Sequence, residues 1–208
     1  MCLSASLLAC SSIPKKETDS STFDIQIFAD EDINLNLLND PSPVRINVLQ
    51  MKTVVEFNQM NALSPDGDYK KHLGDSVLDD ISLLIRPKSS LEFKIPIKEA
   101  SNYLGIVAAY RDLDNNWKFA LYQQDKKWYQ RGGEYLYLHV KADGIHQLSR
   151  KEAIKKILSE DLQKKGQSLT ELGEEEKQKL SKDIERMMNK KKPADLKNGI
   201  FKPVETAQ

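Results

Sequence analysis

Residues 103–110 read Tyr103-Leu104-Gly105-Ile106-Val107-Ala108-Ala109-Tyr110, a run in which nearly every side chain is apolar. A short apolar run bounded by turn-forming residues is typical of a strand that is buried on both faces. Lys98–Asn102 precedes the run and Arg111–Asn116 follows it, and both segments consist mainly of polar residues. Residues 103–110 are therefore predicted to form the central strand of a β-structure.

Strand-like segments recur on both sides of this run, at intervals of about ten residues. In Phe23–Ile27 and Val44–Val48 apolar and polar side chains alternate, as they do in a strand with one buried face. Apolar residues at helical spacing over about 53–63 indicate one short helix. The sequence thus predicts an all-β fold, an antiparallel β-sandwich over residues 23–148 with a short inserted helix. Its other strands are expected at 81–85, 91–97, 117–122, 134–140 and 144–148.

From Ser149 onward the pattern changes to helices that are rich in Glu and Lys. Ser149 and Glu152 have the spacing of a capping box, and a second helix is expected over about Thr170–Asn189. Residues 149–192 are predicted to be a charged helical extension, and 193–208 a tail. The apolar stripes are narrow, so we expect the extension to contribute less to folding than the sheets. It either packs as a hairpin against the sandwich or stands free until a partner covers it.

The amino terminus has the features of a lipid-modified protein. Leu7-Leu8-Ala9-Cys10 resembles a bacterial lipobox, which predicts cleavage before Cys10 and acylation of this cysteine. Residues 10–22 would then be a flexible tether, and residues 1–9 a signal peptide. This peptide contains no Lys or Arg and is short, so the true start can lie upstream of Met1. Two or three acyl chains anchor a protein stably. The alternative is an apolar terminus without function.

The composition argues against several classes of function. Lys plus Arg number 31, and Asp plus Glu also number 31, so the formal net charge is zero. No net positive charge therefore attracts nucleic acid. The histidines His72, His139 and His146 lie on separate predicted elements and are expected at the surface, which predicts no metal site. Asp112 and Asp114 are interpreted as turn residues. The sequence therefore predicts no catalytic residue, no cofactor and no enzymatic activity.

The segment Asp30–Asn39, between the first two predicted strands, is unusual. It is long for such a connection, and Ile33, Leu35 and Leu37 alternate with Asn as though one face were buried. The residues alone leave two interpretations open: an edge strand of the sandwich, or a loop that presents apolar side chains to a partner.

Two motifs carry a resemblance to a known family: Ser42-Pro43-Val44-Arg45-Ile46 and Leu104-Gly105-Ile106-Val107-Ala108-Ala109-Tyr110-Arg111-Asp112. Together with the lipobox they resemble TssJ (SciN), the outer-membrane lipoproteins of type VI secretion. The resemblance covers about residues 7–148. Arg86-Pro87-Lys88-Ser89 stands where the family tends to have Pro-Gly, and the helices from Ser149 are not part of its common pattern.

The resemblance implies a transthyretin-like sandwich that is anchored in the outer membrane, faces the periplasm and acts in the TssJ–TssL–TssM membrane complex. Ser11, after the cysteine, looks like a signal for outer-membrane routing. In this family the loop after the first strand contacts the periplasmic domain of TssM. This would give partner-binding roles to Ile33, Asn34, Leu35, Asn36, Leu37 and Leu38.

A second class of function stays open beside this scaffold. A periplasmic lipoprotein with a sandwich fold can also bind a small ligand or peptidoglycan. A gene for a secretion scaffold would lie beside the genes for TssK, TssL and TssM, which separates the two interpretations.

Overall fold

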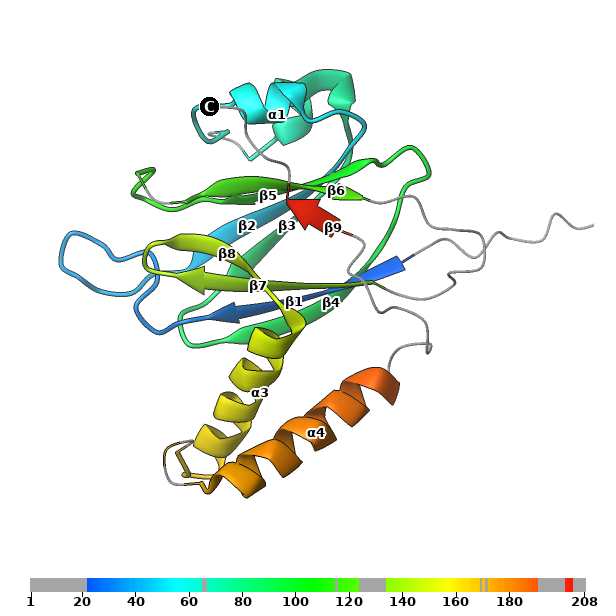
Figure 1. Ribbon diagram of the computed structural model, residues 1–208. Coiled ribbons are helices and arrows are strands. Elements are labelled where there is room, and N and C mark those ends of the chain that lie inside the picture. Colours follow the sequence, from blue (N-terminus) through cyan, green and yellow to red (C-terminus); the bar gives the residue numbers. More distant parts are fainter. Residues whose placement is uncertain are drawn as a thin grey trace, which may run out of the picture.

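The computed structural model describes residues 22–64, 67–114, 116–123, 134–168, 170, 172–190 and 201–203. In this part of the chain two β-sheets form a sandwich, as predicted, and the helices lie outside it (Figure 1). The first sheet has the order β4 (Ser90–Pro96), β1 (Thr22–Ala29), β7 (Glu134–Lys141), β8 (Gly144–Leu148). The second has the order β3 (Val77–Ile85), β2 (Val44–Met51), β5 (Tyr103–Ala108), β6 (Lys118–Gln123), β9 (Phe201–Pro203).

Strand β5 lies inside the second sheet and is covered on both faces, which confirms its predicted central position. Leu104 and Ile106 are buried in the main core, and so are Val107 and Ala108. A Cβ atom on Gly105 would lie only 2.8 Å from atoms of Met51 and Phe57. The outer face of β5 therefore packs so closely against a helix that only glycine fits there.

One strand pair departs from the antiparallel pattern. Strands β1 and β7 run parallel, with Phe23 opposite Glu134 and Ala29 opposite Val140, whereas the other strand pairs are antiparallel. No hairpin links β1 to β7, because the rest of the sandwich separates them in sequence. Their direction is therefore free of the constraint that a short turn imposes.

The region after β2 contains two short helices, where the sequence predicts one. Helix α1 spans Val55–Gln59 and buries Phe57 against the second sheet. Helix α2 spans Tyr69–Leu73, is followed by a 3-10 turn at Gly74–Ser76, and was missed by the sequence analysis. Its signal is Asp68, whose side chain accepts a hydrogen bond from the backbone of Lys71 at 3.0 Å and caps the helix.

The helical extension packs against the sandwich. Helix α3 (Arg150–Lys164) begins with the predicted capping box, and α4 (Glu174–Lys190) begins four residues later than expected. Ala153 of α3 contacts Phe28 and Tyr137 on the outer face of the first sheet. Helix α4 packs on α3 through Ile184. Phe28 is fully buried, so α3 contributes more to the sandwich than its narrow stripe predicts.

The segment predicted as a tail contains the short strand β9, which pairs antiparallel with β6. The rest of residues 193–208 lies outside the described residues, as do residues 1–9 and the predicted tether up to residue 21. No helix in the described part of the chain has the length and apolar character needed to cross a membrane.

We predict that a chain ending after Leu148 still folds cooperatively but is less stable than the full chain. The loss of α3 uncovers Phe28 and part of Tyr137, and burial of one large apolar side chain contributes about 1.5 to 3 kcal/mol. The melting temperature should fall by roughly 5 to 10 °C. Thermal unfolding followed by circular dichroism measures this, and an unchanged melting temperature would show that α3 adds no stability.

Candidate partner-binding site

The connection between β1 and β2 extends from one end of the sandwich as a long loop (Figure 1). We call residues 30–43 the partner loop. It is not an edge strand, because it consists of turns and irregular backbone. Ile33 is fully buried in the main core, and Asn34 is 8% exposed. Their side chains therefore point into the protein and hold the loop in place, and their role in partner binding stays a prediction.

Asn34 connects the partner loop to the turn after β5. Its backbone is left-handed, with φ of 49°, a conformation that asparagine tolerates better than most residues. Its Oδ1 accepts a hydrogen bond from the backbone N–H of Arg111 at 2.8 Å, and its Nδ2 donates to the carbonyl of Pro43 at 2.9 Å. Arg111 Nη1 in turn donates to Ser42 Oγ at 3.0 Å. These bonds fix both ends of the loop to a neighbouring turn.

Asn36 organises the end of the partner loop. Its Oδ1 accepts hydrogen bonds from the backbone N–H groups of Leu38, at 2.8 Å, and Asp40, at 2.9 Å. Its backbone N–H donates to the Asp40 carbonyl at 3.0 Å, and its own carbonyl accepts from Asn39 at 2.9 Å. Asn39 has φ of 62°, which reverses the chain direction within a few residues. The backbone of the tip is therefore ordered by its own hydrogen bonds.

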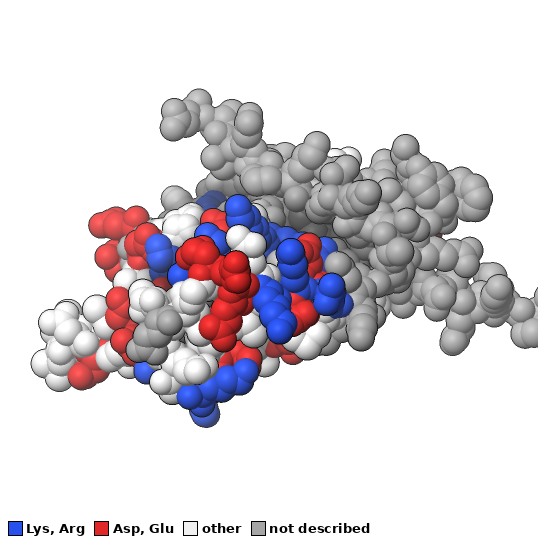
Figure 2. All heavy atoms as spheres, turned by 60° about the horizontal axis from the view of Figure 1, so that its bottom comes forward, with Lys and Arg blue, Asp and Glu red and all other residues white. Residues whose placement is uncertain are grey.

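This backbone presents leucine side chains to solvent. Leu37 is fully exposed, Leu38 is 80% exposed and Leu35 is 40% exposed. We call these three residues the leucine tip. In Figure 2 the end of the loop projects on the left as a mainly uncharged surface, whereas acidic and basic side chains intermingle over the rest of the visible coloured surface. Clustered apolar side chains that are exposed to water are a feature of interaction sites, which makes the leucine tip the candidate site of this chain.

The base of the partner loop is fixed by Asp30. Its Oδ1 accepts hydrogen bonds from His139 Nε2 at 2.8 Å and from Lys156 Nζ at 2.5 Å. Burial alone would raise the pKa of Asp30, but the hydrogen bonds and charges of Lys156 and His139 outweigh it and hold this pKa below its ordinary value. The His139 side chain is only 14% exposed, so its predicted surface position is wrong. Its hydrogen bond to Asp30, a residue far away in sequence, satisfies the ring nitrogen at this partly buried position.

Asp112 and Asp114 are turn residues, as predicted. The Asp112 carboxylate accepts a hydrogen bond from the backbone N–H of Asp114 at 3.0 Å. Among the residues that the structure describes, no group of His, Cys, Asp or Glu side chains is placed to hold a metal ion. The predicted lipidation site, Cys10, lies outside the described residues.

The comparison with known protein families identifies the class of this sandwich. The sequence profile of the type VI secretion lipoproteins VasD, EvfM and TssJ matches residues 21–143, which is more than half of the chain. The chain therefore belongs to the type VI secretion lipoprotein family. This agrees with the TssJ (SciN) resemblance of the sequence motifs. No curated protein matches the chain.

Solved structures share the fold. Lip from Serratia marcescens, a membrane-bound component of the type VI secretion system, is 20% identical, with a TM-score of 0.58 over 63% of this chain and 98% of Lip. TssJ1 from Pseudomonas aeruginosa, a lipoprotein of this system, is 22% identical, with a TM-score of 0.56 over 63% of this chain and 97% of TssJ1. A chain of a type VI membrane complex is 20% identical, with a TM-score of 0.52 over 62% and 98% of the two chains.

We predict that Asp30→Asn destabilises the fold at neutral pH but hardly at acid pH. Hydrogen bonds to a charged group stabilise by about 1.5 to 3 kcal/mol. Since the pKa of Asp30 is lowered in the folded state, its carboxylate stabilises the native protein fully above the unfolded pKa. This contribution is lost as the pH falls below about 4 through the folded pKa. The measurement is urea unfolding of both proteins at pH 7 and pH 3.

The control for this experiment is Asp32→Asn, which changes an exposed carboxylate of the same loop. It should unfold like the unaltered protein at both pH values. A stability difference between Asp30→Asn and the unaltered protein that stays constant from pH 7 to pH 3 would contradict the proposed role of the carboxylate.

Proposed function

We propose that this protein is the outer-membrane lipoprotein of a type VI secretion membrane complex and binds the periplasmic domain of TssM through the leucine tip. The observation that carries the proposal is the exposure of Leu37 and Leu38 on a loop whose backbone is already ordered. Membership of the type VI secretion lipoprotein family supports it. The protein acts as a scaffold in this proposal and performs no chemistry.

The energetics of the leucine tip suit a protein interface. Burying one exposed leucine contributes about 1.5 to 3 kcal/mol, and a few apolar anchors usually dominate the affinity of a complex. The hydrogen bonds of Asn36 hold the tip in one conformation before the partner arrives. Binding therefore loses little conformational entropy of the loop, which leaves more of the burial energy for affinity.

The membrane attachment proposed here runs through Cys10. Acyl chains on this cysteine would hold the protein in the outer membrane, with the sandwich in the periplasm. Residues 10–22 would connect the anchor to β1, which begins at Thr22. They contain mostly polar residues, as a flexible tether requires.

We predict that replacing Leu37 and Leu38 together by Ala weakens binding to the purified periplasmic domain of TssM by at least about tenfold. Each replacement removes apolar surface that the interface would bury, at about 1 to 3 kcal/mol per side chain. The melting temperature should not change, because both side chains already lie in water. Isothermal titration calorimetry and thermal unfolding of the same variant measure the two effects.

Two controls separate binding from folding. Leu84→Ala removes another leucine that is 63% exposed, on β3, and should leave the affinity unchanged. Ile33→Ala removes a buried side chain of the same loop and should lower stability by about 2 to 5 kcal/mol. Full affinity in the Leu37/Leu38 variant would refute the role of the tip.

We predict that Cys10→Ser releases the protein from the membrane into the soluble periplasmic fraction. Serine cannot carry the thioether-linked lipid, so the acyl chains are lost and their burial no longer holds the protein at the bilayer. Cell fractionation followed by immunoblotting measures the distribution, and Cys2→Ser is the matched control that should stay in the membrane fraction. A Cys10→Ser protein that still floats with outer membranes would show that the anchor lies elsewhere.

A further inference from the structure

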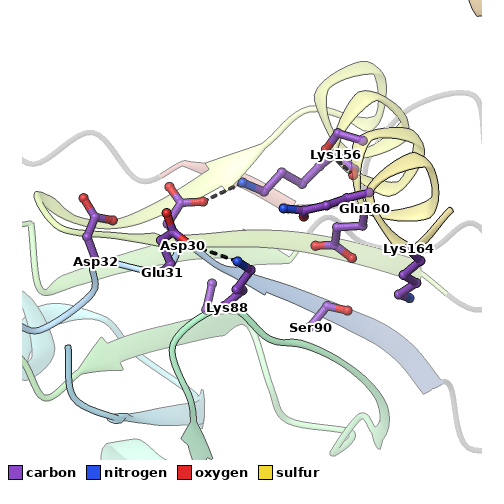
Figure 3. A pocket seen from close by; sticks show the side chains of 11 residues that line it. Asp30, Glu31, Asp32, Lys88, Ser90, Lys156, Glu160 and Lys164 are labelled. Atoms are coloured by element: carbon purple, nitrogen blue, oxygen red, sulfur yellow. Dashed lines mark hydrogen bonds and ion pairs between the residues drawn. The ribbon is translucent and has the colours of Figure 1, made fainter. Parts of the chain in front are cut away.

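A groove lies between helix α3 and the base of the partner loop (Figure 3). Its volume is about 930 Å³. Residues 30–32, Lys88 and Ser90 form the side that belongs to the sandwich. The opposite wall is formed by the side chains of α3, namely Lys156, Ser159, Glu160, Gln163 and Lys164. The groove therefore exists only because the helical extension packs beside the loop.

Two ion pairs neutralise part of the charge in this groove. Lys156 Nζ lies 2.5 Å from Asp30, and Lys88 Nζ lies 3.1 Å from Glu31. The first pair joins α3 to the loop base across the groove, and the second lies within the sandwich side, as the dashed lines in Figure 3 show. Both ammonium groups are thus already engaged, so they attract an anionic ligand only weakly.

Other charged groups of the groove have no such partner among the described residues. These are Asp32, Glu160 and Lys164. Figure 3 shows the Glu160 carboxylate pointing from α3 into the groove, with Asp32 and Lys164 toward opposite ends. Two unpaired carboxylates against one unpaired ammonium group leave the groove with an excess of negative charge.

We propose that this groove binds an extended, basic segment of the same partner protein that the leucine tip binds, an inference that rests on the proposed function. Lysine or arginine side chains of this segment pair with Glu160 and Asp32. A drug-sized small molecule fits less well, because such ligands bind mainly to apolar walls. The leucine tip and the groove then form one continuous surface.

The position of the groove supports this continuity. Asp32 lines the groove and stands three residues before Leu35 of the leucine tip. A polypeptide that covers the tip and continues along the loop passes directly over Asp32 and then along α3. Helix α3 lies beyond residues 21–143, the part that matches the family. The helical extension thus enlarges the proposed interface, because α3 adds its side chains to the contacts of the leucine tip on the shared sandwich.

The test uses two charge reversals on the same helix wall, Glu160→Lys and Lys164→Glu. These side chains stand one helical turn apart, and neither has an ion-pair partner within the described part of the chain. Association of the full chain with the purified periplasmic domain of TssM is measured at low and at physiological ionic strength. Charges at the rim of an interface act mainly on the association rate, and salt screens them.

We expect Glu160→Lys to slow association about three- to tenfold at low ionic strength, and Lys164→Glu to accelerate it by a similar factor. Both effects should shrink as salt is added, and both variants should melt like the unaltered protein. Damage to the fold would weaken binding in both variants, so opposite effects can arise only from charge.

Three results would overturn the inference. Opposite signs, with Glu160→Lys faster and Lys164→Glu slower, would mean that the segment is acidic. Unchanged rates in both variants, while the Leu37/Leu38 replacement still weakens binding, would mean that the partner does not cover the groove and would leave the proposed function intact. A complete lack of binding between the unaltered protein and the TssM domain would refute both proposals.

Discussion

The carboxylate of Asp30 is the contact on which the arrangement of the site depends. It accepts hydrogen bonds from His139 of β7 and Lys156 of α3, while the backbone of Asp30 bonds to Val140 and to Lys88. One residue at the end of β1 thus joins the sheet, the turn before β4, the helical extension and the partner loop. Because the Asp30 carboxylate is partly buried, its interaction with Lys156 is screened less than that of a fully exposed surface pair.

The strands of the sandwich could be predicted from the sequence, because alternation of apolar and polar side chains reports directly which face is buried. Other features have no such local signal. The parallel pairing of β1 and β7 joins segments more than a hundred residues apart, and local alternation says nothing about the direction of such a pair. Helix α2 has only five residues and buries Tyr69 and Leu73, too few for a helical period to be recognised.

The partner loop could be recognised from its composition, but the roles of its residues could not. Alternation places Ile33, Leu35 and Leu37 on one face, whereas the left-handed backbone at Asn34 breaks this pattern and sends Ile33 into the core. The sequence does contain one signal for these turns, the high frequency of asparagine in the loop. Asparagine tolerates positive φ and forms hydrogen bonds to nearby backbone groups. The hydrogen bond of His139 with Asp30 has no sequence signal, because 109 residues separate the two.

The hydrogen bonds of Asn36 have an evolutionary consequence. They close the loop end between residues 36 and 40 without help from the sandwich, which holds the loop at its base, at Ile33 and Asn34, and around Ser42. The side chains at positions 35, 37 and 38 are thus uncoupled from folding and can diversify while the scaffold is conserved. In the proposed interface, exchanging these few side chains would change the partner that a secretion machine binds without changing the fold, so that two machines in one cell could keep their components apart.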